Sequence, residues 1–305
     1  MPFSPSIVRL LEALRHGGEV RAHVTGVAPE TLPHLAAFLR AETGRRILLV
    51  ARDAPRAMLL LEELRHLIDD GREWEQVLHL PRNALSPYID VSVDARRTLE
   101  ALGTLGRVAA VRPGVAGGPG IVVTPATMLL ARLPSPAALR AGTQQLRKGD
   151  VIDRELFVEV LIAAGYSRVS AVYEEGTFAV RGSLVDLFSP GLSHPVRIDF
   201  FGDEIEAIAR FVPDTQMSAG RIDETVFFPA TEVVDRSQVL SRSRSSLLAL
   251  ADAQDLPSTR LSEIVEALRN GELPVGAHAF MPLLLGETAT CTDFFDPREW
   301  LLLFD

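Results

Sequence analysis

Phosphate chemistry is the first activity to consider in this sequence, because it depends on a few residue types at fixed spacing. A P-loop needs the pattern G-x-x-x-x-G-K-[ST], in which the lysine reaches the β- and γ-phosphates of a nucleotide. One of the 31 basic residues is a lysine, and this residue, Lys148, follows no such loop. The sequence therefore excludes nucleotide hydrolysis of the P-loop type and leaves Lys148 as the sole candidate for Schiff-base chemistry.

Gly26 is the remaining candidate for a phosphate site. In VTGVAPET it follows a strand expected over 20–25 and precedes a helix expected from about 29 to 42. An α/β nucleotide-binding fold places a phosphate at such a helix N-terminus. Because the lysine and a second glycine are missing, we interpret Gly26 as a turn glycine of an inactive loop.

The other polar constellations also indicate structure rather than catalysis. Asp203 and Glu204 follow an apolar strand, as an Mg²⁺-binding acidic pair would, but Gly202 and Asp203 predict a hairpin turn instead. The seven histidines show no H-E-x-x-H spacing, and the sequence contains no G-x-S-x-G. The single cysteine, Cys291, is interpreted as a buried free thiol. We therefore predict no catalytic residue, no metal site and no cofactor in this chain.

Composition narrows the class of protein. The 305 residues are 47% hydrophobic and 23% charged, which is sufficient for a packed core in about two domains. The net charge of −9 argues against strong non-specific binding to DNA, which favours a basic surface. One cysteine excludes an internal disulfide and fits a cytoplasmic, reducing environment. Neither a signal-peptide pattern nor an apolar run of 18 residues is present.

The first third of the chain alternates apolar strands with amphipathic helices. Strand 46–51 is followed by a helix that Asp53 is expected to cap. This alternation predicts a parallel sheet with helices on both faces. A further apolar strand is expected over 299–304, and because it comes just before Asp305 we expect the natural protein to continue beyond that residue.

The middle of the chain changes to short strands separated by Gly, Ser and Pro. A helix is expected over 150–164, and the strands between 165 and 211 predict an antiparallel meander. Because side chains alternate across a strand, one face of strand 196–201 carries Val196, Ile198 and Phe200, and the other carries Arg197, Asp199 and Phe201. Arg181 lies opposite the core face of its own strand by the same rule.

Arginine and aromatic side chains on an outward face are typical of binding hot spots. A solvated arginine and a phenylalanine packed under a loop would explain the same pattern without a partner. The residues alone favour that second interpretation.

The residues from 164 to 218 resemble a known family. The motifs are Ala164-Gly165-Tyr166, VYEEGTFAVRGSLVDLFSPG at 172–191, PVRIDFFGDEIEAIARF at 195–211 and PDTQMS at 213–218. They resemble the N-terminal region of the transcription-repair coupling factor family (Mfd), and the same region is similar to the damage-recognition protein UvrB. Weaker matches upstream, VTGVAPET and SPYIDVSVDARRTLEAL, extend the resemblance over essentially the whole chain.

The resemblance implies an α/β fold with a degenerate P-loop, helicase-like parallel-sheet domain in two sequence segments and an inserted smaller α+β domain. The segments would be residues 1–140 and 227–305, with 141–226 as the inserted domain that binds UvrA. In that family the module lacks ATPase activity and the DNA-holding β-hairpin of UvrB, and the stretch between Pro81 and Asp94 is too short here for such a hairpin. ATP and Mg²⁺ serve a separate motor domain of the full-length DNA translocase, and contacts with RNA polymerase and DNA belong to other parts of it.

The resemblance also implies a partner and its contact residues. The expected partner is the repair ATPase UvrA, recruited to RNA polymerase stalled at a lesion, and the matching positions are Arg181, Arg197 and Phe201. Strand alternation places these residues on the outward face, so we expect a binding site there, in a fragment that is monomeric. Alanine at each position is expected to weaken binding and to leave the melting temperature nearly unchanged. Asp199 is expected to orient one of the arginines.

Three alternatives stay open. In the family, this module packs against a distal part of its own chain and hides the UvrA-binding face until polymerase is engaged, so a self-regulatory role is the first. A DNA-contacting module acting like UvrB is the second, and it would need a basic or aromatic hairpin that the sequence does not show. An enzyme is the third, and a nucleotide-dependent shift in melting temperature would reveal it.

Overall fold

The chain forms two compact units, each of which is described by itself. The structure is a computed structural model that describes residues 5–15, 28–68, 77–82, 94–110, 119–232, 245, 248–249, 258–269, 285 and 287–305. The first unit draws on residues 1–82, 111–131 and 291–305, and the second on 83–110 and 132–290. These are units of packing, so the three segments predicted from the sequence, 1–140, 141–226 and 227–305, stay a prediction. No helix in the described part of the chain is long and apolar enough to cross a membrane.

The first unit is built on a four-stranded parallel sheet, as the alternation of strands and helices predicts. The strand order is β14-β1-β3-β2, and every neighbouring pair is parallel. Its elements are α1 (Pro5–Arg15), η1 (Pro29–Thr31), α2 (Leu32–Thr43), β1 (Arg46–Ala51), α3 (Ala54–Leu67), β2 (Val77–His79), β3 (Ile121–Pro125), η2 (Ala126–Leu130), η4 (Cys291–Phe294) and β14 (Trp300–Phe304). The strand at the end of the chain, β14, thus completes one edge of this sheet.

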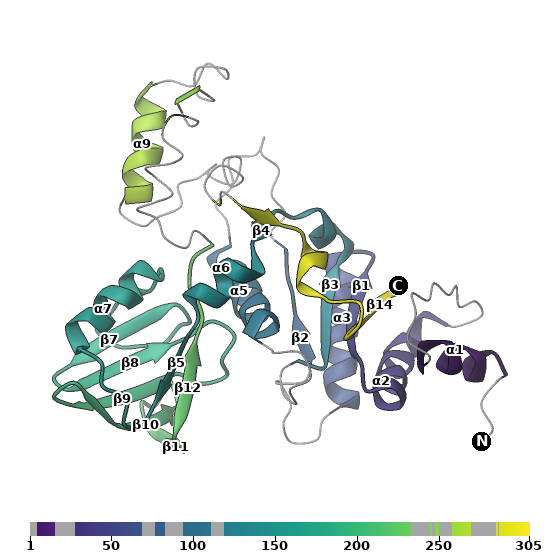
Figure 1. Ribbon diagram of the computed structural model, residues 1–305, viewed down its shortest axis with the longest axis horizontal. Coiled ribbons are helices and arrows are strands. Elements are labelled where there is room, and N and C mark those ends of the chain that lie inside the picture. Colours follow the sequence, from purple (N-terminus) through teal and green to yellow (C-terminus); the bar gives the residue numbers. More distant parts are fainter. Residues whose placement is uncertain are drawn as a thin grey trace. The chain divides into compact units, whose positions relative to one another are not determined.

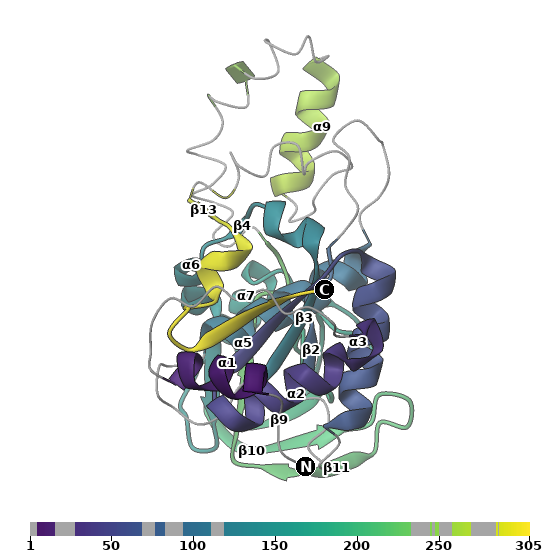
Figure 2. The same ribbon diagram turned by 90° about the vertical axis from the view of Figure 1, so that its right-hand side faces the viewer.

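The sequence explains how the first unit packs. The Asp53 side chain caps α3 by accepting a hydrogen bond of 2.8 Å from the Arg56 N–H, as predicted. Figure 2 shows α1, α2 and α3 lying against the parallel sheet. One side of each strand faces these helices and forms a core that includes Leu39, Ile47, Leu49, Leu60, Leu64, Ile121 and Val123. Side chains return to the same face every two residues in a strand and every 3.6 residues in a helix. The apolar faces that these repeats create therefore pack against each other.

The second unit contains the six-stranded sheet that carries the predicted site. Its elements are α5 (Ala95–Ala110), β4 (Leu133–Pro134), α6 (Pro136–Gly142), β5 (Gln144–Arg147), α7 (Arg154–Ala163), β6 (Ser167–Arg168), β7 (Thr177–Arg181), β8 (Leu184–Phe188), β9 (Val196–Phe201), β10 (Glu204–Phe211), β11 (Ser218–Ile222), β12 (Glu224–Phe227), α9 (Ser258–Arg269) and β13 (Thr288–Ala289). The strand order is β11-β10-β9-β8-β7-β6. Strands β7 to β11 are antiparallel neighbours, which confirms the predicted meander, and β6 adds a parallel edge strand.

Helix α7 covers one face of this sheet, which we call the inner face (Figure 1). Phe157 and Leu161 of α7 pack on buried side chains that include Phe178, Val185, Leu187, Val196, Ile198, Phe200, Ile205 and Ile208. The Phe157 ring meets the Phe227 ring edge-on, with 5.8 Å between centroids. The alternation predicted for strands 177–181 and 196–201 is thus confirmed on the core side.

Helix α5 joins the second unit through a close backbone crossing. A Cβ added at Gly103 would collide with the backbone of Gly191, and one at Gly106 would lie 2.6 Å from the Phe228 ring. Gly103 therefore lets α5 approach the loop after β8 more closely than alanine would, and Gly106, one turn later, leaves room for the Phe228 ring.

Two predicted helices differ from the structure. The helix expected over 150–164 begins only at Arg154, because the Asp153 side chain caps it by accepting a hydrogen bond of 2.8 Å from the Leu156 N–H. Residues just before it pair with β10 instead. The helix expected after strand 121–124 is a short 3₁₀ turn, η2. Gly26, the strand expected over 20–25 and the stretch between Pro81 and Asp94 fall wholly or largely outside the described residues.

Candidate functional site

The predicted site residues lie on the face of the six-stranded sheet opposite α7, which we call the outer face. In β9, Val196, Ile198 and Phe200 are buried, whereas the Phe201 side chain is 78% exposed. Strand register places Arg181 opposite Leu184, and Leu184 opposite Asp199, in one row across this face. The structure therefore brings Arg181, Arg197 and Phe201 onto one face.

One end of the outer face is covered by residues 169–175, which we call the covering segment. The N–H of its first residue, Val169, donates a hydrogen bond of 2.9 Å to the Phe178 carbonyl. Its central residue, Val172, is buried together with Ala179 and Phe211 in a small cluster on this side of the sheet. A second apolar cluster thus occupies half of a face that alternation alone predicts to be exposed.

Gln216 fastens the covering segment from the turn after β10. Its side-chain amide donates to the Val172 carbonyl over 3.0 Å and to the Pro213 carbonyl over 2.7 Å. The backbone of Gln216 has a φ of 57°, a left-handed conformation that costs free energy in a non-glycine residue. The PDTQMS motif therefore builds a tight turn whose glutamine holds the covering segment in place.

Arg197 is committed to the protein itself. Its guanidinium donates to both carboxylate oxygens of Asp186, over 2.7 Å from Nε and 2.8 Å from Nη2. The Asp186 side chain is 1% exposed, and the guanidinium lies 4.9 Å from the centroid of the Phe211 ring. The hydrogen bond to Asp186 raises the pKa of Arg197 above its usual value. This side chain therefore stabilises the outer-face cluster before any partner arrives.

The role expected for Asp199 is wrong in this arrangement. Its carboxylate accepts a hydrogen bond of 3.0 Å from the Ser183 hydroxyl, and the arginine on its strand is oriented by Asp186. Spacing along β9 pointed to Asp199 because Asp199 and Arg197 lie on one face of that strand. The residue directly opposite Arg197 on β8, however, is Asp186. A cross-strand neighbour is closer than a residue two positions along the same strand.

Arg181 lies at the edge of the covering segment, and Phe201 marks the open end of the outer face. The exposed Arg181 guanidinium donates to the Ser170 carbonyl over 3.3 Å from Nε and 2.9 Å from Nη2, which leaves its remaining N–H groups for a partner. Phe201 ends β9 at the turn with β10, where Gly202 has a φ of 63°. The hairpin predicted for Gly202 and Asp203 is confirmed.

The side chains on the outer face are of the types that bind protein surfaces. Phe201 supplies apolar area at low entropic cost, and Arg181 supplies fork-shaped donors for a carboxylate or carbonyl. In the described part of the chain, no group of three His, Cys, Asp or Glu side chains could hold a metal ion. The predicted burial of Cys291 is confirmed, and burial raises the pKa of its thiol to about 12, far from reactive thiolate.

Sequence reasoning missed three residues that shape this face: Asp186, Gln216 and Val151. Asp186 could have been found, because an acidic residue at a core-adjacent position of β8 needs a cationic partner. Gln216 lies within the PDTQMS motif, but its contact with residue 172 spans 44 positions and has no local signal. Val151 was assigned to a helix, and its pairing with β10 appears only in three dimensions.

Comparison with known proteins agrees with this geometry. Residues 145–233 match the family model of the UvrB interaction domain, and that range contains the whole six-stranded sheet and α7. The match therefore includes Arg181, Arg197 and Phe201.

Curated relatives match nearly the whole chain. The transcription-repair-coupling factor of Myxococcus xanthus is 32% identical over 295 residues, which cover 96% of this chain and 24% of the relative. That of Escherichia coli (strain K12) is 28% identical over 94% of this chain, and that of Mycobacterium bovis is 31% identical over 92%. The chain spans about a quarter of the length of these relatives, 22–24%. By sequence, this chain is therefore a relative of the transcription-repair-coupling factors that carries a UvrB interaction domain at residues 145–233.

Proposed function

We propose that this chain is a non-catalytic binding module that recruits the repair protein UvrA to RNA polymerase stalled at a lesion. The observation that carries the proposal is the outer face, on which Phe201 is 78% exposed and Arg181 lies two strands away, both within the residues that match the UvrB interaction domain. An aromatic anchor and an arginine with spare donors are the side chains that dominate protein interfaces. The module acts without a cofactor of its own, and polymerase and DNA are contacted by other parts of a longer chain.

Arg197 enters this proposal in a supporting role. Because its guanidinium is held by Asp186, its replacement changes the stability of the outer-face cluster as well as any contact with UvrA. We therefore expect Arg197→Ala to lower the melting temperature, whereas the sequence alone predicted that it stays nearly unchanged for all three alanine variants. Phe201 is the clean probe of binding, whereas Arg181 also donates to the Ser170 carbonyl of the covering segment, so the melting temperature of Arg181→Ala is measured beside its affinity.

The test is a calorimetric titration of the cognate UvrA into this chain. Phe201→Ala is expected to raise the dissociation constant by about thirtyfold, and Arg181→Ala by about tenfold. Met217→Gln is the matched control, because Met217 is 69% exposed but lies in the turn at the far end of β10. Tight binding that survives Phe201→Ala and Arg181→Ala alike would remove the site from the outer face.

Each of the three alternatives predicts a different result with the same protein preparation. Absence of binding by a folded wild-type chain would contradict recruitment and favour the self-regulatory role, in which this face packs against a distal part of the same chain. A rise in melting temperature with ATP and Mg²⁺ would contradict the non-catalytic assignment. Binding to duplex DNA at physiological salt would favour a UvrB-like contact with DNA.

A further inference from the structure

Three exposed side chains from three chain segments form a row at the open end of the outer face. Glu204 pairs with Phe201 across the β9–β10 turn and with Val151 on its other side. Two backbone hydrogen bonds frame that second pair, from Ile152 N–H to Asp203 O at 2.7 Å and from Ile205 N–H to Asp150 O at 2.9 Å. Directly paired residues of antiparallel strands carry their side chains on the same face. Val151 therefore lies on the outer face, in line with Phe201.

The two apolar members of this row are equally exposed. The Val151 side chain is 76% exposed and that of Phe201 is 78% exposed. Two strand spacings of about 4.8 Å separate them, so they lie about 10 Å apart with Glu204 between them. A single exposed apolar residue needs no explanation, but two in one row beside a candidate interface are typical of a binding surface.

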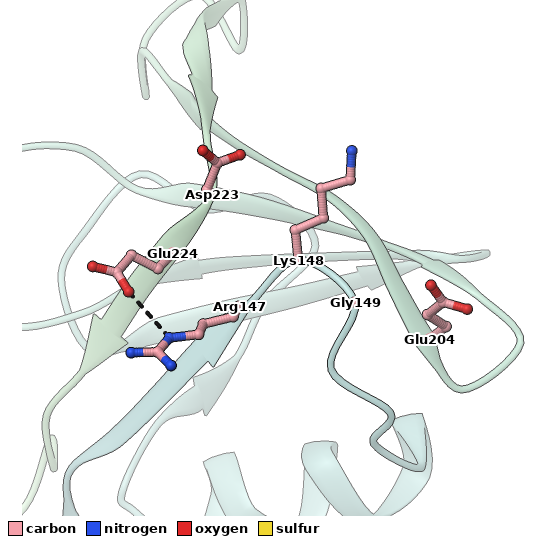
Figure 3. Close-up of a pocket in the computed structure, with 6 residues that line it drawn as sticks. All are labelled: Arg147, Lys148, Gly149, Glu204, Asp223 and Glu224. Atoms are coloured by element: carbon pink, nitrogen blue, oxygen red, sulfur yellow. Dashed lines mark hydrogen bonds and ion pairs between the residues drawn. The ribbon is translucent and has the colours of Figure 1, made fainter.

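An open pocket of about 440 Å³ continues the row on the side away from Phe201. It is lined by Arg147, Lys148, Gly149, Glu204, Asp223 and Glu224 (Figure 3). Arg147 donates to Glu224 over 3.1 Å, whereas the Lys148 side chain points away from that pair. Among the described residues, no side chain is bonded to the Lys148 ammonium or to the Glu204 carboxylate. Apart from the Arg147–Glu224 pair, the pocket lining thus presents one cation, Lys148, and two carboxylates, Glu204 and Asp223, to an incoming protein.

We propose that the UvrA-binding surface continues from Phe201 across Glu204 to Val151 and ends at Lys148. In this arrangement UvrA places apolar side chains on Phe201 and on Val151, a basic group at Glu204 between them and a carboxylate at Lys148. The inference rests on the proposed function, because it assigns further contact residues to the same interface. The match to the UvrB interaction domain begins at residue 145, so it includes the segment that carries Lys148 and Val151.

Binding titrations with UvrA test the apolar part of the row. Val151→Thr keeps the branched shape and is expected to raise the dissociation constant about threefold, and Val151→Asp about tenfold or more. Because Val151 and Phe201 do not touch, the effects of Val151→Thr and Phe201→Ala are expected to multiply in the double variant. Met217→Gln again serves as the control, about 20 Å away along the eight residues of β10. Circular dichroism confirms that each variant is folded.

Lys148 offers a test that needs no substitution. As the single lysine of the chain, it gives one modified peptide when the protein reacts with sulfosuccinimidyl acetate, apart from the N-terminal amine. Saturating UvrA is expected to slow acetylation of Lys148 at least fivefold in the wild-type chain. In the Phe201→Ala variant, the same concentration of UvrA is expected to leave the rate of Lys148 acetylation unchanged. Mass spectrometry measures the extent of acetylation over time.

The outcomes separate this inference from the proposed function. If UvrA binds and Phe201→Ala weakens binding, the proposed function holds. If, in that case, both Val151 variants bind like wild type and Lys148 reacts at an unchanged rate in the complex, the extension is overturned. If the folded wild-type chain does not bind UvrA, the proposed function itself fails and the row belongs to another contact, such as a distal part of the same chain.

Discussion

The inner and outer faces of the six-stranded sheet are built from the same strands but differ in burial and in the interactions of their side chains. The inner face is a continuous apolar core under α7, whereas the outer face combines a small apolar cluster, a buried ion pair and an exposed row. Because β9 alternates between them, neighbouring residues such as Phe200 and Phe201 have unrelated roles: one is 4% exposed and the other 78%. Position on a face, more than residue type, decides whether a phenylalanine stabilises the fold or is left for a partner.

The inner face should show the largest effect on stability. Phe178 is completely buried between α7 and the neighbouring strands. Phe178→Ala is expected to lower the free energy of unfolding by about 4 kcal/mol, through lost apolar transfer and the cavity left behind. Urea denaturation followed by circular dichroism measures this loss in the free energy of unfolding. A cost below about 1 kcal/mol would show that the two faces are less different than their burial indicates.

The second largest effect on the free energy of unfolding is expected from the Arg197–Asp186 ion pair on the outer face. Arg197→Ala leaves the buried Asp186 carboxylate without its bidentate partner and is expected to cost about 3 kcal/mol in the same denaturation experiment. The double variant Arg197→Met with Asp186→Leu removes both charges and should recover most of that loss. If Arg197→Ala instead leaves stability unchanged and weakens only UvrA binding, Arg197 is a contact residue like Phe201.

The sequence predicted the alternation that creates the two faces, and it predicted strands 177–180, 184–188, 196–201 and 204–211 to within one residue. It could do so because strand period and turn glycines are local signals. A strand also expected over 168–173 is wrong, because β6 ends at Arg168 and the covering segment follows it. The sequence could not predict that residues 169–175 cover half of the outer face, since their anchors, Arg181 and Gln216, are distant in sequence. The pairing of Val151 with Glu204 was hidden for the same reason, because the nearby Asp150 and Asp153 both suggested a helix start.

A third prediction concerns the end of the covering segment. Burial, together with nearby Glu100, raises the pKa of Glu175 to about 7, against opposing contributions from the Gly191 N–H and Arg96. Because the folded-state pKa lies above the unfolded value near 4.5, folding favours the protonated carboxyl, and stability falls as pH rises between these values.

Glu175→Gln removes this titration while keeping an oxygen that accepts from the Gly191 N–H. It is expected to raise the free energy of unfolding by about 1 kcal/mol at pH 8 and to change it little at pH 4. Urea denaturation at both pH values measures the difference. An equal effect at both pH values would mean that the glutamine acts through packing, and that Glu175 does not titrate between these pH values.

Substitutions in the exposed row should change the free energy of unfolding least of all. They therefore mark the lower end of the comparison between the two faces. Phe201→Ala removes a side chain that is mostly in water already, so its free energy of unfolding is expected to change by less than about 0.5 kcal/mol. The same substitution is expected to weaken UvrA binding about thirtyfold, an effect of about 2 kcal/mol that appears only in the complex. A variant that binds poorly but unfolds like wild type separates recognition from folding on a single strand. If Phe201→Ala lost stability as Phe178→Ala does, the side chain would be packed in solution, and the outer face would be a second core rather than a surface held ready for a partner.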